Sequence, residues 1–234
     1  MNPVRSNRQF VHYSFFKLDP GWHLLPTEVR GEGKREFLRV YSEASQGMSL
    51  LKSYSLVGIR GDVDFMLCKA SEDLESLHTL GAHLLGTGLG KWLRTPYTYL
   101  AMTRESIYIQ GHQHKGQEGT RTRLTHGDSR YLFVYPFVKT RQWYSLPIEE
   151  RQRMMRTHFT VGHKFPSVKI HTAYSYGLDD QEFVLGFETE SPADFLDLVI
   201  ALRETEASRY TERDTPIFTC LRMELPTILD SLGS

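Results

Sequence analysis

The sequence predicts an α+β fold in which two ferredoxin-like βαββαβ repeats form a dimeric α+β barrel within one chain. Three observations support this prediction. The first is a weak internal repeat: Trp22-His-Leu-Leu-Pro26 matches Trp143-Tyr-Ser-Leu-Pro147, at a spacing of about 120 residues. The second is a further match at nearly the same spacing, between Gly61–Leu67 and Asp179–Leu185. The third is the order of elements in each half, which reads strand, helix, strand, strand, helix, strand.

The first strand and helix are clearest in the second half. Residues 131–138 are rich in aromatic and β-branched side chains, which favour a strand. Pro147 then opens a helix, and Glu149 and Glu150 lie in its first turn, where acidic groups suit the helix dipole. We expect this helix to span residues 148–159.

The remaining elements of the second half follow in order. Residues 168–176 and 182–188 read as an antiparallel pair across a Gly-Leu-Asp-Asp turn. Ser191-Pro-Ala-Asp starts a helix that runs to about Tyr210, with apolar residues at helical spacing. Residues 217–223 close the half as its last strand.

The repeat divides the chain into three parts. We expect an N-terminal half at residues 1–104, a linker loop at 105–129 and a C-terminal half at 130–234. The linker is polar and rich in glycine and histidine. Long loops of this kind often carry functional residues.

Composition excludes several classes of function. Lysine plus arginine equals aspartate plus glutamate, at 28 each, so the net charge indicates neither a nucleic-acid nor an anionic-membrane partner. No stretch approaches the ~20 apolar residues of a membrane span, and no signal peptide is evident. We therefore expect a cytoplasmic protein with a small-molecule or protein partner. Cys68 and Cys220 lie in apolar runs, as buried free thiols do.

His158 is the candidate metal ligand. No glycine-rich nucleotide motif, HExxH or GxSxG is present, so single positions must carry the argument. His158 lies near the end of the predicted helix 148–159, where an imidazole can be held against a flat cofactor, and histidine is a common ligand of heme iron. The alternative is a capping or surface histidine, which is the more frequent role at a helix end.

Tyr135 and Lys139 pair a phenol with a cation. They lie four residues apart on a predicted strand and so share one face. The alternative is a core aromatic residue beside a lysine that reaches solvent. Arg121, Arg123 and Arg209 are candidates for binding substrate carboxylates, since guanidinium matches carboxylate geometry; a solvated surface explains them equally well.

Taken together, these residues resemble the chlorite dismutase-like heme proteins, and within that family the coproheme decarboxylases. The family's fold is a pair of ferredoxin-like halves, in agreement with the repeat. The resemblance is thin in the N-terminal half. It is carried by Tyr135-Pro-Phe-Val-Lys139, Trp143-Tyr-Ser-Leu-Pro-Ile-Glu-Glu-Arg151, the helix to His158, Gly177-Leu-Asp-Asp180 and Leu202-Arg-Glu-Thr-Glu-Ala-Ser-Arg-Tyr210.

The resemblance implies a role for each candidate. His158 matches the proximal iron ligand, Tyr135 the tyrosine that is oxidised to a radical, and Lys139 a lysine that contacts a propionate. Three more positions are assigned to the cofactor: Arg123 and Arg209 as propionate-binding arginines and Ile170 as the distal residue. The implied reaction is the hydrogen peroxide-dependent decarboxylation of iron coproporphyrin III (coproheme) to heme b, the last step of heme biosynthesis. Coproheme would be both substrate and redox cofactor.

Several alternatives stay open. Chlorite dismutases carry a distal arginine and lack a tyrosine matching Tyr135. An apolar Ile170 cannot donate a hydrogen bond to an oxyanion, so the residues favour a decarboxylase. A base for peroxide would then come from His112 or His114 in the linker, or from His171, which alternation turns to the face opposite Ile170.

Other functions compatible with the pattern are a peroxidase-like heme enzyme, a heme carrier or sensor without turnover, and a barrel that binds no heme. The resemblance also implies a homo-oligomer, a ring of five.

Overall fold

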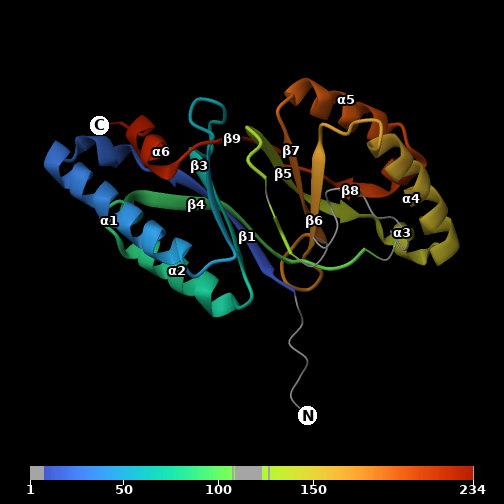
Figure 1. Cartoon of the computed structure of the whole chain (residues 1–234), viewed down its shortest axis with the longest axis horizontal. Helices are drawn as coiled ribbons and strands as arrows, with labels where there is room; N and C mark the ends of the chain where they lie inside the picture. The colour runs from blue at the N-terminus through green and yellow to red at the C-terminus, as the bar shows by residue number, and fades with distance from the viewer. Residues whose placement is uncertain (1–7, 107, 109–122, 126, 234) are drawn as a thin grey trace, which may run out of the picture.

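The strands form one closed barrel, shown in Figure 1. The computed structural model describes residues 8–106, 108, 123–125 and 127–233. The strand order is β7-β6-β4-β1-β3-β2-β9-β5-β8, and a further pairing of β7 with β5 closes the ring, leaving only β8 outside it. Every registered pair of neighbouring strands is antiparallel. The predicted α+β barrel of two repeats is therefore confirmed.

Each half supplies its own strands and helices. The N-terminal half holds β1 Phe10–Leu18, η1 Pro20–Leu24, α1 Thr27–Ser45, β2 Leu50–Ser55, β3 Phe65–Ser71, α2 Leu74–Gly86, η2 Gly90–Trp92 and β4 Leu93–Met102. The later part of the chain holds β5 Tyr131–Lys139, α3 Arg141–Ser145, α4 Ile148–Gly162, β6 Lys169–Tyr174, β7 Phe183–Thr189, α5 Pro192–Arg203, η3 Glu206–Tyr210, β8 Thr211–Arg213, β9 Phe218–Arg222 and α6 Leu225–Ser231.

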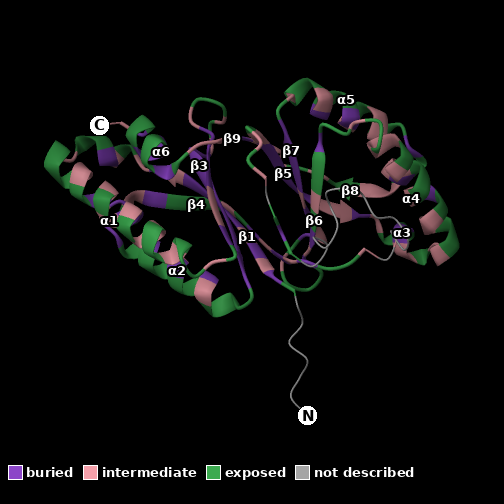
Figure 2. Ribbon diagram, in the orientation of Figure 1, coloured by how far each residue is buried: buried purple, intermediate pink, exposed green. Residues whose placement is uncertain are grey.

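Alternation along the strands builds two layers of apolar core. On β1, Val11, Tyr13 and Phe15 point into the barrel, where they pack with Val134 and Phe218 from the other half. The outward side chains of the strands are also buried, because the helices cover them (Figure 2). Both faces of most strands are thus apolar, and the polar faces of the helices meet solvent.

The outer layer of the N-terminal half includes the end of the chain. Helices α1 and α2 cover one side of the barrel, and α6 lies beside them (Figure 1). Leu225, Ile228 and Leu229 of α6 join the core cluster that also contains Phe37 of α1 and Leu80 of α2. A helix that follows the C-terminal half in sequence therefore packs on the N-terminal half in space.

The turn between β2 and β3 and the turn between β6 and β7 share one backbone conformation. Gly58 and Gly177 have positive φ angles of 73° and 71°, and each precedes an exposed aliphatic residue, Ile59 or Leu178. Only glycine adopts this conformation without steric cost. The turns thus add a third match between the two halves to the two matches found in the sequence.

One predicted boundary is wrong. The helix expected to run to about Tyr210 ends at Arg203, and a separate 3-10 turn, η3, covers Glu206–Tyr210. The cause is Thr205, whose backbone is extended at φ −75° and ψ 151° and whose hydroxyl donates to the Leu202 carbonyl at 2.7 Å. A threonine that satisfies a last carbonyl of a helix in this way competes with continuation of the helix.

Candidate functional site

The candidate site lies on the outer face of β5, β7 and β6, beneath α4 and α5. Tyr135 on β5 stacks on Phe187 of β7, with ring centroids 5.6 Å apart and planes 10° apart. Phe133 stacks on Phe195 of α5 at 3.9 Å. The result is an aromatic wall between the sheet and the helices, built by outward positions that recur every second residue.

Tyr135 is held with its ring in this wall. The residue is 7% exposed, and no hydrogen-bond partner of its hydroxyl is recorded among the described residues. Burial raises the pKa of Tyr135, Asp214 adds to the rise and Arg203 opposes it. Arg203 and Asp214 form an ion pair at 2.5 Å. The phenol of Tyr135 therefore stays protonated at neutral pH. The two charges nearby, on Arg203 and Asp214, neutralise each other.

His158 projects from α4 toward the segment after α5. Its Nδ1 lies 3.5 Å from the hydroxyl of Thr205, two residues beyond the end of α5. Burial, together with the nearby Lys139 ammonium, lowers the pKa of His158 to about 4. The ring is therefore a neutral imidazole at pH 7, the form that binds metals.

Lys139 ends β5 and is buried beside the same segment. Its Nζ donates to the Ala207 carbonyl at 2.6 Å and lies 4.7 Å from the Trp143 ring centroid and 5.3 Å from that of Phe137. Burial lowers the pKa of Lys139 to about 8, with Glu182 opposing. The predicted shared face of Tyr135 and Lys139 is confirmed, because both residues contact the outward aromatic layer that includes Phe137.

One short segment, residues 202–214, links the three residues. It supplies the Arg203–Asp214 pair beside Tyr135, Thr205 beside His158, and the carbonyl of Ala207 that binds Lys139. Arg209 lies in the same segment on η3, is exposed, and forms no ion pair within the described residues.

Two further candidates lie apart from one another. Ile170 on β6 pairs with Phe187, so it shares the outward face of the aromatic wall, and it is 39% exposed. Arg123 instead forms an ion pair with Glu72 at the edge of the N-terminal half, at 2.9 Å. The structure thus brings Ile170 to the wall and shows no contact of Arg123 with Tyr135, His158 or Lys139.

Of the three histidines predicted as candidate bases for peroxide, the structure describes His171. His171 points to the face opposite Ile170, as predicted, and its Nε2 lies 3.2 Å from the buried Glu188 carboxylate. His112, His114 and the predicted arginine at 121 lie outside the described residues.

A polar triad beneath Lys139 was not anticipated from the sequence. The Tyr144 hydroxyl lies 2.5 Å from Glu182 Oε2 and 2.7 Å from the Tyr176 hydroxyl. The same Glu182 oxygen accepts from the Lys139 backbone N–H at 2.8 Å. This triad fixes the end of β5 and, with it, the position of Lys139.

The sequence contains only partial evidence for the residues that contact Lys139 and His158. Trp143 and Thr205 both lie inside motifs singled out above, yet neither motif shows that one meets Lys139 and the other His158. The interrupted helical pattern at Glu-Thr-Glu after Arg203 was the available sign for Thr205. Contacts between segments so far apart in the chain leave no local pattern.

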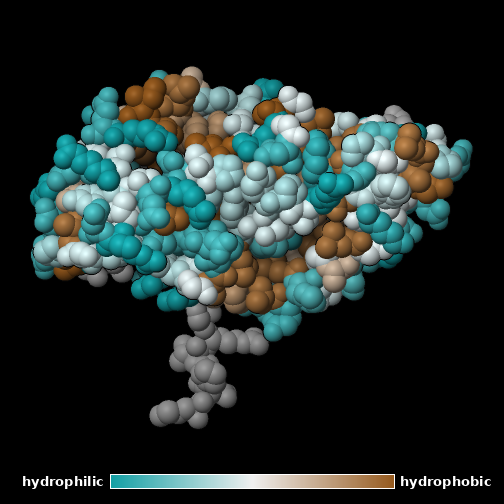
Figure 3. All heavy atoms as spheres, turned by 180° about the vertical axis from the view of Figure 1, so that it is seen from behind, coloured by the Kyte–Doolittle hydropathy of each residue, from teal (hydrophilic) through white to brown (hydrophobic). Residues whose placement is uncertain are grey.

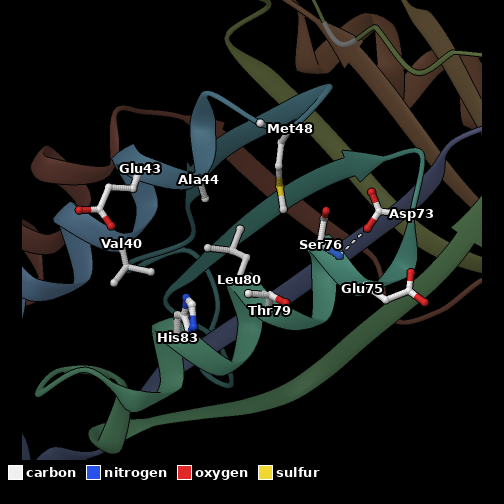
Figure 4. Close-up of a pocket in the computed structure, with 11 residues that line it drawn as sticks. Val40, Glu43, Ala44, Met48, Asp73, Glu75, Ser76, Thr79, Leu80 and His83 are labelled. Atoms are coloured by element: carbon white, nitrogen blue, oxygen red, sulfur yellow. Dashed lines mark hydrogen bonds between the residues drawn. The ribbon is translucent and has the colours of Figure 1, made fainter.

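Two other surface features lie outside this site. A groove between α1 and α2 has an apolar floor that includes Val40, Met48 and Leu80 and an acidic rim, and it contains none of the predicted residues (Figure 4). Apolar side chains also gather over α5, at the upper left of Figure 3, where Leu196 and Ile200 are exposed.

Within the described ranges, no three histidine, cysteine, aspartate or glutamate side chains gather into a metal-binding group. None of the helices in the described part of the chain is long and apolar enough to cross a membrane. Cys68 and Cys220 are both free and buried, as predicted.

Comparison with known proteins places these features in context. A family model described as chlorite dismutase matches residues 30–223. The chain is 27% identical to a coproheme decarboxylase of Mycolicibacterium smegmatis, over 98% of this chain and 96% of that protein.

Solved structures are similar over almost the whole chain. A mutant chlorite dismutase from Candidatus Nitrospira defluvii matches with a TM-score of 0.87 and 26% identity, over 97% of this chain and 95% of the other. A heme-binding protein from Thermus thermophilus has the same fold, with a TM-score of 0.84 and 23% identity over 97% and 95% of the two chains.

Proposed function

Because this chain belongs to the chlorite dismutase family, we propose that it uses hydrogen peroxide to decarboxylate iron coproporphyrin III, or coproheme, to heme b. The observation that carries the proposal is the joint placement of Tyr135 and His158. One lies in the aromatic wall of β5 and the other on α4, and residues 202–214 contact both environments. The curated relative named coproheme decarboxylase supports the same reaction.

The side chains present fit an iron porphyrin that carries carboxylates. His158 offers a neutral imidazole, the wall around Tyr135 and Ile170 offers apolar surface, and Lys139 and Arg209 offer cations. A single histidine suffices for iron when a macrocycle supplies the equatorial ligands. A free metal ion held by protein alone would need several side chains, as structural zinc sites do.

Each residue would have a defined task. His158 would bind the iron, and Lys139 and Arg209 would hold propionates, with Arg123 a further candidate once its pair with Glu72 opens. When bound, the iron centre would supply the oxidising power of hydrogen peroxide. Tyr135 would then give up an electron and its proton, and the phenoxyl oxygen would take a hydrogen atom from the β-carbon of a nearby propionate.

The reaction balances for each propionate. The carboxylate, one hydrogen peroxide and one proton give a vinyl group, carbon dioxide and two water molecules. The bond between the α-carbon and the carboxyl carbon breaks, the propionate loses two electrons and the peroxide gains them. Two rounds convert coproheme to heme b. The raised pKa of Tyr135 keeps the phenol protonated before each round, so that proton and electron leave together.

The test is direct. The purified chain is loaded anaerobically with iron coproporphyrin III and titrated with hydrogen peroxide, and the porphyrin is followed by mass spectrometry. We expect stepwise loss of two carboxyl groups in the wild type and no loss in Tyr135→Phe. Tyr131→Phe is the matched control, since Tyr131 lies on the same strand and packs against the same cluster.

The other outcomes separate the alternatives. Binding without loss of mass would indicate a carrier or sensor, and absence of binding would reject the heme site. Release of oxygen from chlorite by the same preparation would favour the chlorite dismutase activity, to which the similarity with solved chlorite dismutases gives weight. The ring of five and the cytoplasmic location stay predictions. Native mass spectrometry and fractionation of cells test them.

A further inference from the structure

Thr205 connects the candidate iron ligand to the end of a helix. Its hydroxyl oxygen lies 2.7 Å from the Leu202 carbonyl and 3.5 Å from His158 Nδ1. A carbonyl oxygen only accepts hydrogen bonds, so the single hydroxyl hydrogen of Thr205 is committed to Leu202. The remaining lone pairs of the oxygen can only accept, and the group that faces them is the His158 ring.

We propose that Thr205 sets the tautomer of His158, so that Nδ1 carries the proton and Nε2 keeps a free lone pair. What binds at that lone pair rests on the proposed function. The tautomer itself does not, because it follows from the direction of the two hydrogen bonds. A hydrogen-bond acceptor at one imidazole nitrogen fixes which of the two nitrogens is free to bind a metal.

The geometry that holds Thr205 is part of the fold rather than of a flexible loop. The residue is buried, and its backbone N–H bonds to the same Leu202 carbonyl at 3.1 Å. It directly follows Glu204, the C-cap residue of α5, and is the N-cap residue of η3. The hydroxyl is therefore fixed before any ligand enters.

A hydroxyl acceptor has a different consequence from a carboxylate. Because the Thr205 oxygen is neutral and its proton is already donated, it cannot draw the Nδ1 proton away as an aspartate or glutamate can. The nearby charge is the Lys139 ammonium, which is hydrogen-bonded to Ala207. A bound iron would therefore meet a neutral imidazole, a weaker donor than one with imidazolate character.

The internal repeat supplies a matched control. Thr87 ends α2 in the same way: its hydroxyl donates to the Leu84 carbonyl at 2.7 Å, the same distance as in the Thr205 pair. Its oxygen accepts from the Gly90 backbone N–H at 3.0 Å instead of from a histidine. Thr87→Val thus removes the same helix-end hydrogen bond without touching His158.

The experiment uses histidine labelled with ¹⁵N in the chain without porphyrin. Nitrogen chemical shifts report which ring nitrogen carries the proton. In the wild type, Thr205→Ser and Thr87→Val, we expect His158 to be protonated at Nδ1. In Thr205→Val we expect that preference to be lost. An unchanged Nδ1–H signal in Thr205→Val would overturn the proposal.

A second readout uses iron coproporphyrin III as the probe. Loss of the hydroxyl that accepts from His158 should weaken porphyrin binding about tenfold in Thr205→Val, and Thr205→Ser should restore it. Thr205→Asp should lower the reduction potential of the bound iron relative to the wild type, since a carboxylate strengthens the imidazole donor. A potential that rises or stays unchanged in Thr205→Asp would contradict the neutral-imidazole argument. If the wild type binds no porphyrin, the heme proposal fails while the nitrogen shifts still decide the role of Thr205.

Discussion

Lys69 is a buried cation in the N-terminal half whose cost to stability can be worked out. It is 2% exposed on β3, and its Nζ donates to the Ser14 hydroxyl on β1 at 2.8 Å. No carboxylate partner is recorded for it within the described residues. When the two halves are aligned by the internal repeat, Lys69 falls near the position of Phe187. The N-terminal half thus has the polar pair of Lys69 and Ser14 where the C-terminal half has the aromatic ring that stacks on Tyr135.

Burial lowers the pKa of Lys69 from its ordinary value of 10.5 to about 8, with a small opposing effect of Cys68. At 1.36 kcal/mol per pKa unit, holding the charged form at pH 7 costs about 3 kcal/mol. Lys69→Met keeps most of the side-chain volume and removes the charge, while one hydrogen bond worth about 1 kcal/mol is lost. We expect the free energy of unfolding at pH 7 to rise by about 2 kcal/mol.

The pH dependence has a definite sign. Because the folded-state pKa is the lower one, the unfolded chain keeps a proton that the folded chain has lost between about pH 8 and pH 10.5. Wild-type stability should therefore rise with pH through this window, and the advantage of Lys69→Met should shrink.

Urea unfolding at pH 7 and pH 9.5 measures the effect, with Lys91→Met as the matched control, since Lys91 on η2 is exposed. A Lys69→Met chain that is less stable than the wild type at pH 7, or an advantage that is the same at both pH values, would refute the reasoning.

Four further predictions concern the turn, the helix and the site. Gly177→Ala should lower the free energy of unfolding by about 1 kcal/mol in urea, because alanine is strained at a φ of 71°, and should leave porphyrin affinity unchanged. Ser191→Ala should cost about 1 kcal/mol by the same assay, since the Ser191 hydroxyl caps α5 by accepting from the Asp194 N–H at 3.2 Å. Lys139→Met should weaken binding of coproporphyrin more than that of its methyl esters in fluorescence titrations; equal losses would argue against a propionate contact. Replacing His112 and His114 by alanine should slow peroxide-driven decarboxylation, and an unchanged rate would remove both as the base.

The sequence predicted the barrel because two of its signals are local and repeated. The Trp22 and Trp143 motifs mark the same place in each half, and alternation along residues 131–139 placed Tyr135 and Lys139 on one face. Signals of this kind depend on period and spacing, which a chain displays directly.

Periodicity and repeat spacing do not predict contacts between segments that are far apart in the chain. The helix after Ser191 was extended through Thr205, since a single β-branched residue is a weak helix breaker. Only the fold shows that this residue meets His158. Likewise, nothing in the sequence indicated that Arg123 pairs with Glu72, or that Glu182 binds both Tyr144 and the end of β5.

The position of α6 has a consequence for how the protein is made. The N-terminal half is synthesised first, yet the apolar surface on α1 and β2 that receives α6 stays uncovered until α6 itself has left the ribosome. At ordinary rates of translation this interval is on the order of ten seconds. During it, β2 also lacks β9, its neighbour in the finished barrel. The nascent chain therefore exposes an open strand edge beside an uncovered apolar patch, which is a natural target for a chaperone. The barrel closes and the N-terminal core is covered only once β9 and α6 have been made, after the residues around His158.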